Sequence, residues 1–109
     1  MATSKDFADF VAGQLENAGS ITYKKMFGEY GLYADGKIIA LLCDNQLFIK
    51  PTEAGKHYIG TVTEAPPYSG AKMYYLIDDK LDDREWLCGL VRVMLPELPE
   101  PKPKKKKTK

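Results

Sequence analysis

Residue types that bind metals or act as nucleophiles are scarce in this chain of 109 residues, which has one histidine, His57, and two cysteines, Cys43 and Cys88. A structural zinc site needs about four such ligands close together. A cysteine or serine nucleophile needs a histidine base held beside it. His57 lies in a short polar segment, and neither cysteine has a neighbouring ligand type. We therefore expect no enzymatic activity, no metal and no cofactor.

The two cysteines do not form a C-x-x-C pair, and each lies in an apolar segment. This pattern favours two buried thiols in a reducing cytoplasm, and a disulfide or redox pair is the alternative. Long hydrophobic runs are also absent, since no stretch of about 18 apolar residues occurs, and we expect no membrane span. The N-terminus, MATSKDFADF, lacks the apolar core of a secretory signal. We expect a cytoplasmic protein.

Acidic residues are absent after residue 100, so the charge of this chain is unevenly distributed. Residues 1–100 hold ten basic and 15 acidic groups, a net charge of −5, although the whole chain has a net charge of +1. The lysines of the basic end are Lys102, Lys104, Lys105, Lys106, Lys107 and Lys109. Such a block is usually disordered and often acts as an interaction arm, and a merely solubilising end is the alternative. Any nucleic-acid contact is therefore expected through these lysines only, since the body lacks a basic face.

The remaining composition, 44% hydrophobic and 11% aromatic, suits one two-layer core. We predict a domain over residues 1–96 and a Pro/Lys-rich disordered tail over 97–109. Hydrophobic periodicity and turn residues predict, in order, a helix over 4–18, an extended lead-in over 21–27, strands 29–34, 37–43 and 46–50, a helix over 52–59, a short strand near Tyr68, a strand over 72–77, and a helix that Asp82 caps and Pro96 ends. This order, α-β(3)-α-β(2)-α, predicts an α+β domain in which helices cover one face of an antiparallel sheet.

The segment MFGEYGLYADG, residues 26–36, holds three glycines and three aromatic residues and admits three interpretations. A phosphate-binding loop would open a helix, whereas Gly28 and Gly31 precede a strand. A strand that stacks bases needs aromatic and basic residues on one face. Here Tyr30 and Leu32 share one face, Gly31 and Tyr33 share the other, and neither face carries both aromatic and basic side chains. The favoured interpretation is a strand whose aromatics pack against helices, with glycines that allow close approach or a bulge.

The same residues resemble the signature of the N-terminal domain of the TfoX/Sxy family. The matching motif is Met26, Phe27, Gly28, Tyr30, Gly31, Leu32 and Tyr33, followed by Asp35 and Gly36. Leu47, Phe48, Ile49 and Lys50 follow at the family's spacing, and Met73, Tyr74 and Tyr75 resemble its Met-Ser-Tyr-Tyr segment. The likeness covers roughly residues 5–95. It rests on the Phe-Gly-x-Tyr-Gly-Leu core and the adjacent hairpin together.

The resemblance implies a fold of the secretion-chaperone type, α-β(3)-α-β(2)-α in two layers. It also implies a role in transcription, because full-length members regulate natural competence together with the cyclic-AMP receptor protein. Two departures stand out. Glu29 occupies the place of a usual glycine, and the lysine block stands where the family has a second, helical domain. We therefore expect a stand-alone form of the domain, and the resemblance carries over no catalytic residue.

Three functions follow as hypotheses. The first is a small cytoplasmic regulator that contacts a protein, either of the transcription machinery or a second copy, with weak nonspecific DNA contact through the lysines. The alternative is a chaperone-like or adaptor dimer that binds a peptide segment of a partner, motivated by the apolar strand 37–43. The third is a small-molecule sensor, which would need one concave surface lined by Tyr30, Tyr33, Tyr74, Tyr75 and Trp86. The acidic run 78–85 is interpreted as a helix N-terminus.

Overall fold

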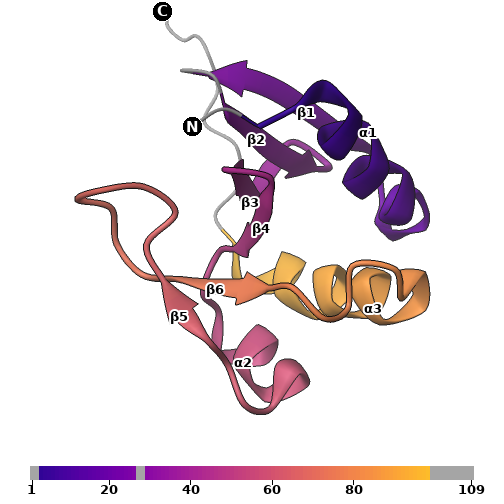
Figure 1. The fold of residues 1–109 in the computed structure, drawn as a ribbon. Coiled ribbons are helices and arrows are strands. Elements are labelled where there is room, and N and C mark those ends of the chain that lie inside the picture. Colours follow the sequence, from indigo (N-terminus) through magenta and orange to yellow (C-terminus); the bar gives the residue numbers. More distant parts are fainter. Residues whose placement is uncertain (1–2, 27–28, 99–109) are drawn as a thin grey trace, which may run out of the picture.

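The computed structural model describes residues 3–26 and 29–98 and shows three α-helices around one sheet (Figure 1). The elements, in chain order, are α1 (Lys5–Gln14), the 3₁₀ turn η1 (Glu16–Ala18), β1 (Ile21–Met26), β2 (Glu29–Ala34), β3 (Lys37–Cys43), β4 (Gln46–Ile49), α2 (Glu53–Ile59), β5 (Glu64–Ala65), β6 (Tyr74–Ile77), α3 (Arg84–Met94) and η2 (Leu95–Glu97). The predicted α+β class with an antiparallel sheet is confirmed.

The sheet has six strands in the order β1-β2-β3-β4-β6-β5, and every neighbouring pair is antiparallel. Two-residue turns join β2 to β3 and β3 to β4. The φ angles are positive at Asp35 (53°), Gly36 (83°), Asp44 (54°) and Asn45 (56°). Glycine, aspartate and asparagine tolerate this region best, which explains why these turn signals are reliable in the sequence.

Three details of the predicted order are wrong. The segment expected to lead in as extended chain is a full strand, β1, because it pairs with β2 along six residues, so four strands precede α2. The short strand lies at Glu64–Ala65, and Tyr68 lies in the following loop. Two prolines directly before Tyr68 cannot donate to a ladder, which disfavours a strand there. The cap of α3 is Asp83, whose carboxylate accepts the Trp86 N–H at 3.1 Å, and not Asp82.

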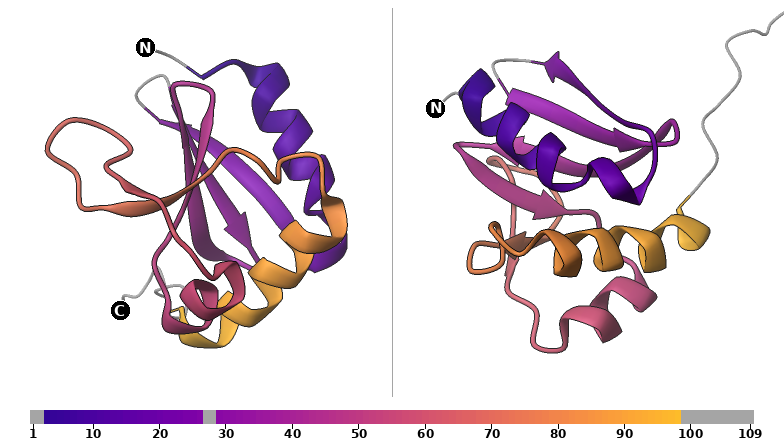
Figure 2. Two further views of the ribbon diagram at one scale, coloured as in Figure 1. Left: turned by 60° about the horizontal axis from the view of Figure 1, so that its bottom comes forward. Right: turned by 90° about the vertical axis from the view of Figure 1, so that its right-hand side faces the viewer.

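Helices α1 and α3 cover the same face of the sheet, and α2 packs against α3 (Figure 2). The core between these helices and the sheet includes Val11, Leu32, Leu42, Leu47 and Leu90, each 0% exposed. The predicted helix over 4–18 begins at the Ser4 cap, whose side chain accepts the N–H of the third residue after it, and its last turn continues as η1. The apolar sides of the amphipathic helices are thus buried against one face of the sheet.

The α2–α3 contact depends on a glycine. The Tyr58 hydroxyl donates a hydrogen bond of 2.9 Å to the Trp86 carbonyl, and the two rings lie 5.4 Å apart. A Cβ atom at Gly89 would collide with the Tyr58 side chain. The absence of a side chain at this position therefore lets the two helices approach closely.

The end of the described chain is fastened to the domain at three places. The Glu97 carboxylate accepts the backbone N–H groups of Glu53 and Ala54 at 2.9 and 2.8 Å, at the start of α2. The Lys37 ammonium donates to the Leu95 carbonyl at 2.9 Å, and Leu98 is only 5% exposed. Glu97 and Leu98 therefore pack with the domain, while the predicted tail beyond residue 98 lies outside the described residues.

Candidate functional site

The motif that carries the family resemblance is an architectural element in this structure. Tyr30 and Leu32 face the helices as core residues, and Gly31 and Tyr33 lie on the opposite face, as strand alternation predicts. A register shift in the β2–β3 pairing follows at Leu32 and Tyr33, so a bulge is present close to Gly31. Met26 ends β1, whereas Phe27 and Gly28 lie outside the described residues. The motif thus builds the first strands of the sheet and presents no reactive group.

The face of the sheet opposite α1 and α3, which we call the outer face, carries a row of apolar side chains. Cross-strand pairs connect Gly31 with Leu41, Leu41 with Phe48, and Phe48 with Leu76. Leu41 and Leu76 are half-buried, whereas Phe48 is only 4% exposed and lies outside the core cluster of the helical face. Among the described residues, no helix covers this row (Figure 2). An apolar sheet face without a helical cover is the first candidate for an interaction surface.

Opposite charges lie at the two ends of the outer face. Near the start of β3, the Lys24 ammonium lies over the Tyr33 ring, 5.7 Å from its centroid, and Tyr33 pairs with Ile38. Near the end of β3, the backbone N–H of Asp44 donates to the Glu29 carboxylate at 3.1 Å, and the carboxylates of Glu29 and Asp44 both lie near the Cys43 thiol. The outer face is therefore apolar along its middle, positive at one end and negative at the other.

Cys43 lies at the acidic end of the outer face and is unreactive in this environment. Burial, followed by the carboxylates of Glu29 and Asp44, raises the pKa of its thiol to about 11. A nucleophilic cysteine needs a lowered pKa, so Cys43 holds its proton at neutral pH. Both cysteines are free and buried, as expected from the sequence.

Glu29, which departs from the family pattern, belongs to a polar network at this end. The Thr3 hydroxyl lies 2.5 Å from the Glu29 carboxylate and 3.0 Å from the Leu42 carbonyl, and it accepts the Asn45 N–H at 3.2 Å. Thr3 is 5% exposed. The network joins the chain start, the start of β2 and the β3–β4 turn, so it fixes the position of the acidic end. The sequence does not reveal this grouping, because its members lie far apart in the chain.

The loop between β5 and β6, residues 66–73, projects from the sheet beside the outer face (Figures 1 and 2). Tyr68 is 61% exposed and Met73 is 53% exposed. Tyr74 follows in β6, and burial raises the pKa of its hydroxyl. The nearby side chains of Tyr68 and Cys43 raise this pKa further. Aromatic residues and methionine are enriched in protein interfaces. The sequence analysis did not predict this exposed loop. The available signal was an aromatic residue, Tyr68, directly after two prolines.

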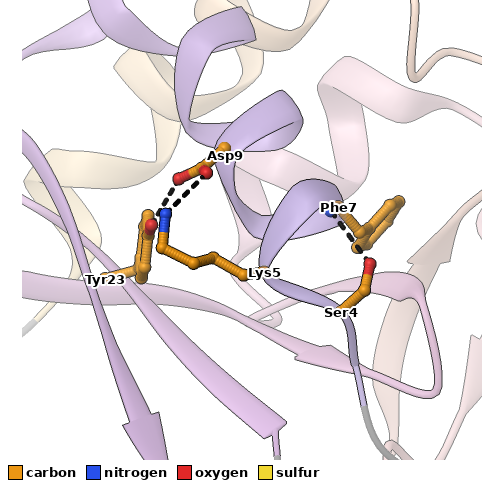
Figure 3. A network of polar contacts seen from close by, with 5 residues as sticks. All are labelled: Ser4, Lys5, Phe7, Asp9 and Tyr23. Atoms are coloured by element: carbon orange, nitrogen blue, oxygen red, sulfur yellow. Dashed lines mark hydrogen bonds and ion pairs between the residues drawn. The ribbon is translucent and has the colours of Figure 1, made fainter.

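A second polar network joins α1 to β1 on the opposite side of the molecule (Figure 3). The Tyr23 hydroxyl donates a short hydrogen bond to the Asp9 carboxylate, and the Lys5 ammonium lies 3.0 Å from the same carboxylate. The hydrogen bond to Asp9 raises the pKa of Tyr23, so this phenol is not activated as a base or nucleophile. The Tyr23 ring also packs edge-to-face on Tyr30, with centroids 5.2 Å apart. This network positions the edge strand, and we assign it no chemistry.

The five aromatics that a small-molecule sensor would need do not line one concavity. Tyr30 and Tyr75 are buried in the core on the helical face, while Tyr33 and Tyr74 lie on the outer face. Trp86 packs between α2 and α3. The predicted concave surface lined by these five aromatics is therefore wrong, because strand alternation places neighbouring tyrosines on opposite faces of the sheet.

Other candidate chemistry is also dispersed. Among residues 3–26 and 29–98, no three His, Cys, Asp or Glu side chains come together as a metal ion would require. His57 lines an open hollow of 340 Å³ with Glu53, Lys56 and Gly60. No helix in this part of the chain is both long enough and apolar enough to cross a bilayer. The six lysines assigned to nucleic-acid contact lie outside the described residues, so that assignment stays a prediction.

Comparison with known proteins gives two matches. The model of the TfoX N-terminal domain matches residues 13–95. An uncharacterised 12.7 kDa protein from the trpE 5' region of Spirochaeta aurantia is 41% identical over 109 residues. The alignment covers 100% of this chain and 95% of that relative, so the two proteins are similar along nearly their whole lengths.

Proposed function

The chain belongs to the TfoX N-terminal domain family, and from this premise we propose that it is a small, non-enzymatic cytoplasmic regulator that acts by binding a protein of the transcription machinery. One observation carries the proposal. The outer face and the neighbouring loop keep Leu41, Leu76, Tyr68 and Met73 partly or largely exposed, although the helices fill the other face completely. Such side chains form the centre of protein interfaces.

The proposed binding surface consists of the apolar row of the outer face and the loop 66–73. It offers apolar side chains bordered by charged groups, as protein interfaces do. Interfaces of this kind gain most of their affinity from a few apolar anchors. Tyr68 and Met73 are the best anchors, because they are the most exposed large apolar side chains next to the outer face.

A complementation experiment tests this proposal. In a native host that lacks the gene, transcripts are measured after return of the wild type, of a Tyr68→Ala/Met73→Ala variant, or of Phe10→Ala. Phe10 is a matched control, because it is 46% exposed but lies on α1, away from the outer face. We expect the wild type and Phe10→Ala to restore the transcript pattern and the loop variant to fail while remaining folded. An unchanged pattern in the deletion strain would rule out a regulator, and full rescue by the loop variant would rule out this surface.

Nonspecific DNA contact through the lysine block is a separate part of the proposal. Binding to duplex DNA should fall steeply with salt, because each phosphate contact releases a counterion. The salt dependence is measured for the full chain and for a chain that lacks residues 101–109. If the full chain does not bind even at low salt, DNA contact is excluded, and the protein-binding role is unaffected.

The alternative function is a chaperone-like or adaptor dimer, and the edge of the sheet favours it. Strand β1 has six residues and pairs with β2 alone among the described strands, while the opposite edge, β5, has two residues. An edge of this length accepts an added strand from a peptide or a second copy. Light scattering at micromolar concentration tests self-association. A strict monomer that also binds no extended peptide would exclude this alternative.

A further inference from the structure

Opposite charges on the outer face are placed symmetrically about its apolar row. On β2, Gly31 belongs to the row, with Glu29 two residues before it and Tyr33 two residues after it. Strand alternation places all three on the outer face. The Lys24 ammonium lies over the Tyr33 ring. A negative and a positive group therefore lie at similar distances on the two sides of Gly31.

The end of β4 repeats this arrangement. Phe48 belongs to the row, and strand alternation places Lys50, two residues later, on the outer face. The Lys50 N–H donates to a β3 carbonyl at 2.9 Å, so the ladder continues to this residue. On the other side of Phe48, the last β3–β4 pair is followed by the turn that holds Asp44. Lys50 thus lies on the same side of the row as the Lys24 ammonium, and Asp44 lies on the side of Glu29.

A two-fold axis that runs along the row matches both charge pairs at once. Rotation about this axis turns a second copy face to face with the first and reverses the direction of its strands. Positions across the sheet are kept, so Lys24 meets Glu29 of the second copy, and Lys50 meets Asp44 of the second copy. Packed sheets lie about 10 Å apart, a gap that a lysine and a carboxylate side chain bridge from the two sides.

The acidic groups are available for such contacts. The Thr3 hydroxyl and the Asp44 N–H both bond to Oε1 of Glu29, and no hydrogen bond from another described residue uses Oε2. Asp44 itself is exposed. The area is also sufficient for a weak complex. Five strands about 4.8 Å apart, over a length of about 20 Å, offer about 500 Å² per copy, or about 1,000 Å² in total, which is the lower end of specific interfaces.

We propose that the outer face binds a second copy of this chain with the strands of the two sheets antiparallel, so that the Lys24 and Lys50 side of each copy contacts the Glu29 and Asp44 side of the other. This inference rests on the register and the charges of the sheet and does not depend on the proposed regulator function. A protein partner of the outer face competes with the second copy for the same apolar row.

Dilution of the full chain tests which surface associates. Amide NMR spectra are recorded from millimolar to micromolar concentration, at low and at high salt. We expect the signals of Gly31, Leu41 and Leu76 to shift on dilution, and the dimer to weaken in high salt because its charge pairs are screened. A chain that stays monomeric at millimolar concentration overturns the proposal. Shifts confined to β1 also overturn it, since they would assign association to the sheet edge.

Charge variants test the antiparallel orientation. Lys24→Glu should raise the Kd of the dimer at least about tenfold, because the two-fold axis turns two attractions into two repulsions. The matched control is Lys25→Glu, the same charge change on the opposite face of β1, which should alter the Kd by no more than about twofold. Equal Kd values for the two variants overturn the proposal.

A charge swap completes the test. Lys24→Glu combined with Glu29→Lys restores opposite charges across the interface and should return the Kd to within about threefold of the wild type. Because Glu29 also bonds to Thr3, folding of this variant is checked by circular dichroism. Lys50→Glu combined with Asp44→Lys repeats the swap on the other charge pair. A folded swap variant that dimerises no better than its single lysine variant overturns the proposal.

Discussion

The two faces of the sheet achieve burial in different ways. On the helical face, Leu32, Leu42 and Leu47 are 0% exposed beneath α1 and α3. On the outer face, Leu41 and Leu76 are half-buried, and charged groups border them at both ends. The helical face is complete within the domain, and the outer face has the composition of a surface that something else covers.

This difference separates stability from function. Neighbouring residues of β3 point to opposite faces, so adjacent leucines of the same strand serve the core and the candidate interaction surface respectively. Changes on the helical face should therefore act on folding, and changes on the outer face should act on binding. Variants at adjacent positions can test this separation directly.

The largest expected effect is the contrast between Leu42→Ala and Leu41→Ala. Leu42 is 0% exposed in the core, and its truncation should lower the free energy of unfolding by about 2–5 kcal/mol. Leu41 is half-buried on the outer face, and its truncation should cost about 1 kcal/mol or less. The cost is smaller because the Leu41 side chain buries less apolar area than the Leu42 side chain. Chemical denaturation of both variants measures the contrast. Equal losses would mean that the outer face is a second core and not an interaction surface.

A smaller effect is expected from Gly31→Val. Gly31 is buried on the outer face, between Lys24 and Leu41 of the neighbouring strands. A branched side chain there should cost about 1–3 kcal/mol through overpacking. The control is Gly13→Ala in α1, where no described residue outside the surrounding helix turns places a heavy atom within 4 Å of the added Cβ, and a gain of about 0.5–1 kcal/mol is expected. Thermal or chemical unfolding measures both, and a Gly31→Val variant as stable as the wild type would contradict close packing at Gly31.

The smallest effect concerns the exposed rim of the helical side. Hydrogen bonds from Tyr23 and then from Lys5 lower the pKa of the Asp9 carboxyl below its ordinary value of 3.8. Because the pKa of Asp9 is lower in the folded protein, its ionised carboxylate stabilises the fold at pH values above the ordinary pKa. This stabilisation is lost as the pH falls through the lowered pKa of the folded protein. Asp9→Asn should therefore be slightly less stable than the wild type at about pH 7, with the difference vanishing at about pH 2. Denaturation curves at the two pH values check this, and a difference that persists in acid would assign it to another cause.

Local signals predicted most of the sheet. The turns at Asp35-Gly36 and Asp44-Asn45 identified β2, β3 and β4, because positive φ angles restrict which residues occur there. The alternation of Tyr30 and Gly31 assigned the two faces correctly. The strand β1 was missed because it is an edge strand with polar residues, and its strand character comes from pairing with β2.

The candidate site was much less predictable. The sequence marked the motif and the lysines, but the outer face depends on β6 pairing with β4, a neighbour far away in the chain. Likewise, Thr3, Glu29 and Asn45 meet only because three separate segments converge at one end of the sheet. Long-range pairing of this kind leaves no local pattern to recognise.

By itself, the sequence determined the α+β class, the family and the basic end, because residue composition, turn chemistry and a contiguous motif are local properties. Only the tertiary structure decided that Gly31 lies in an apolar row and that charged groups border this row. Those properties depend on which strands become neighbours. Strand order results from the packing of the whole domain, and no single segment encodes it.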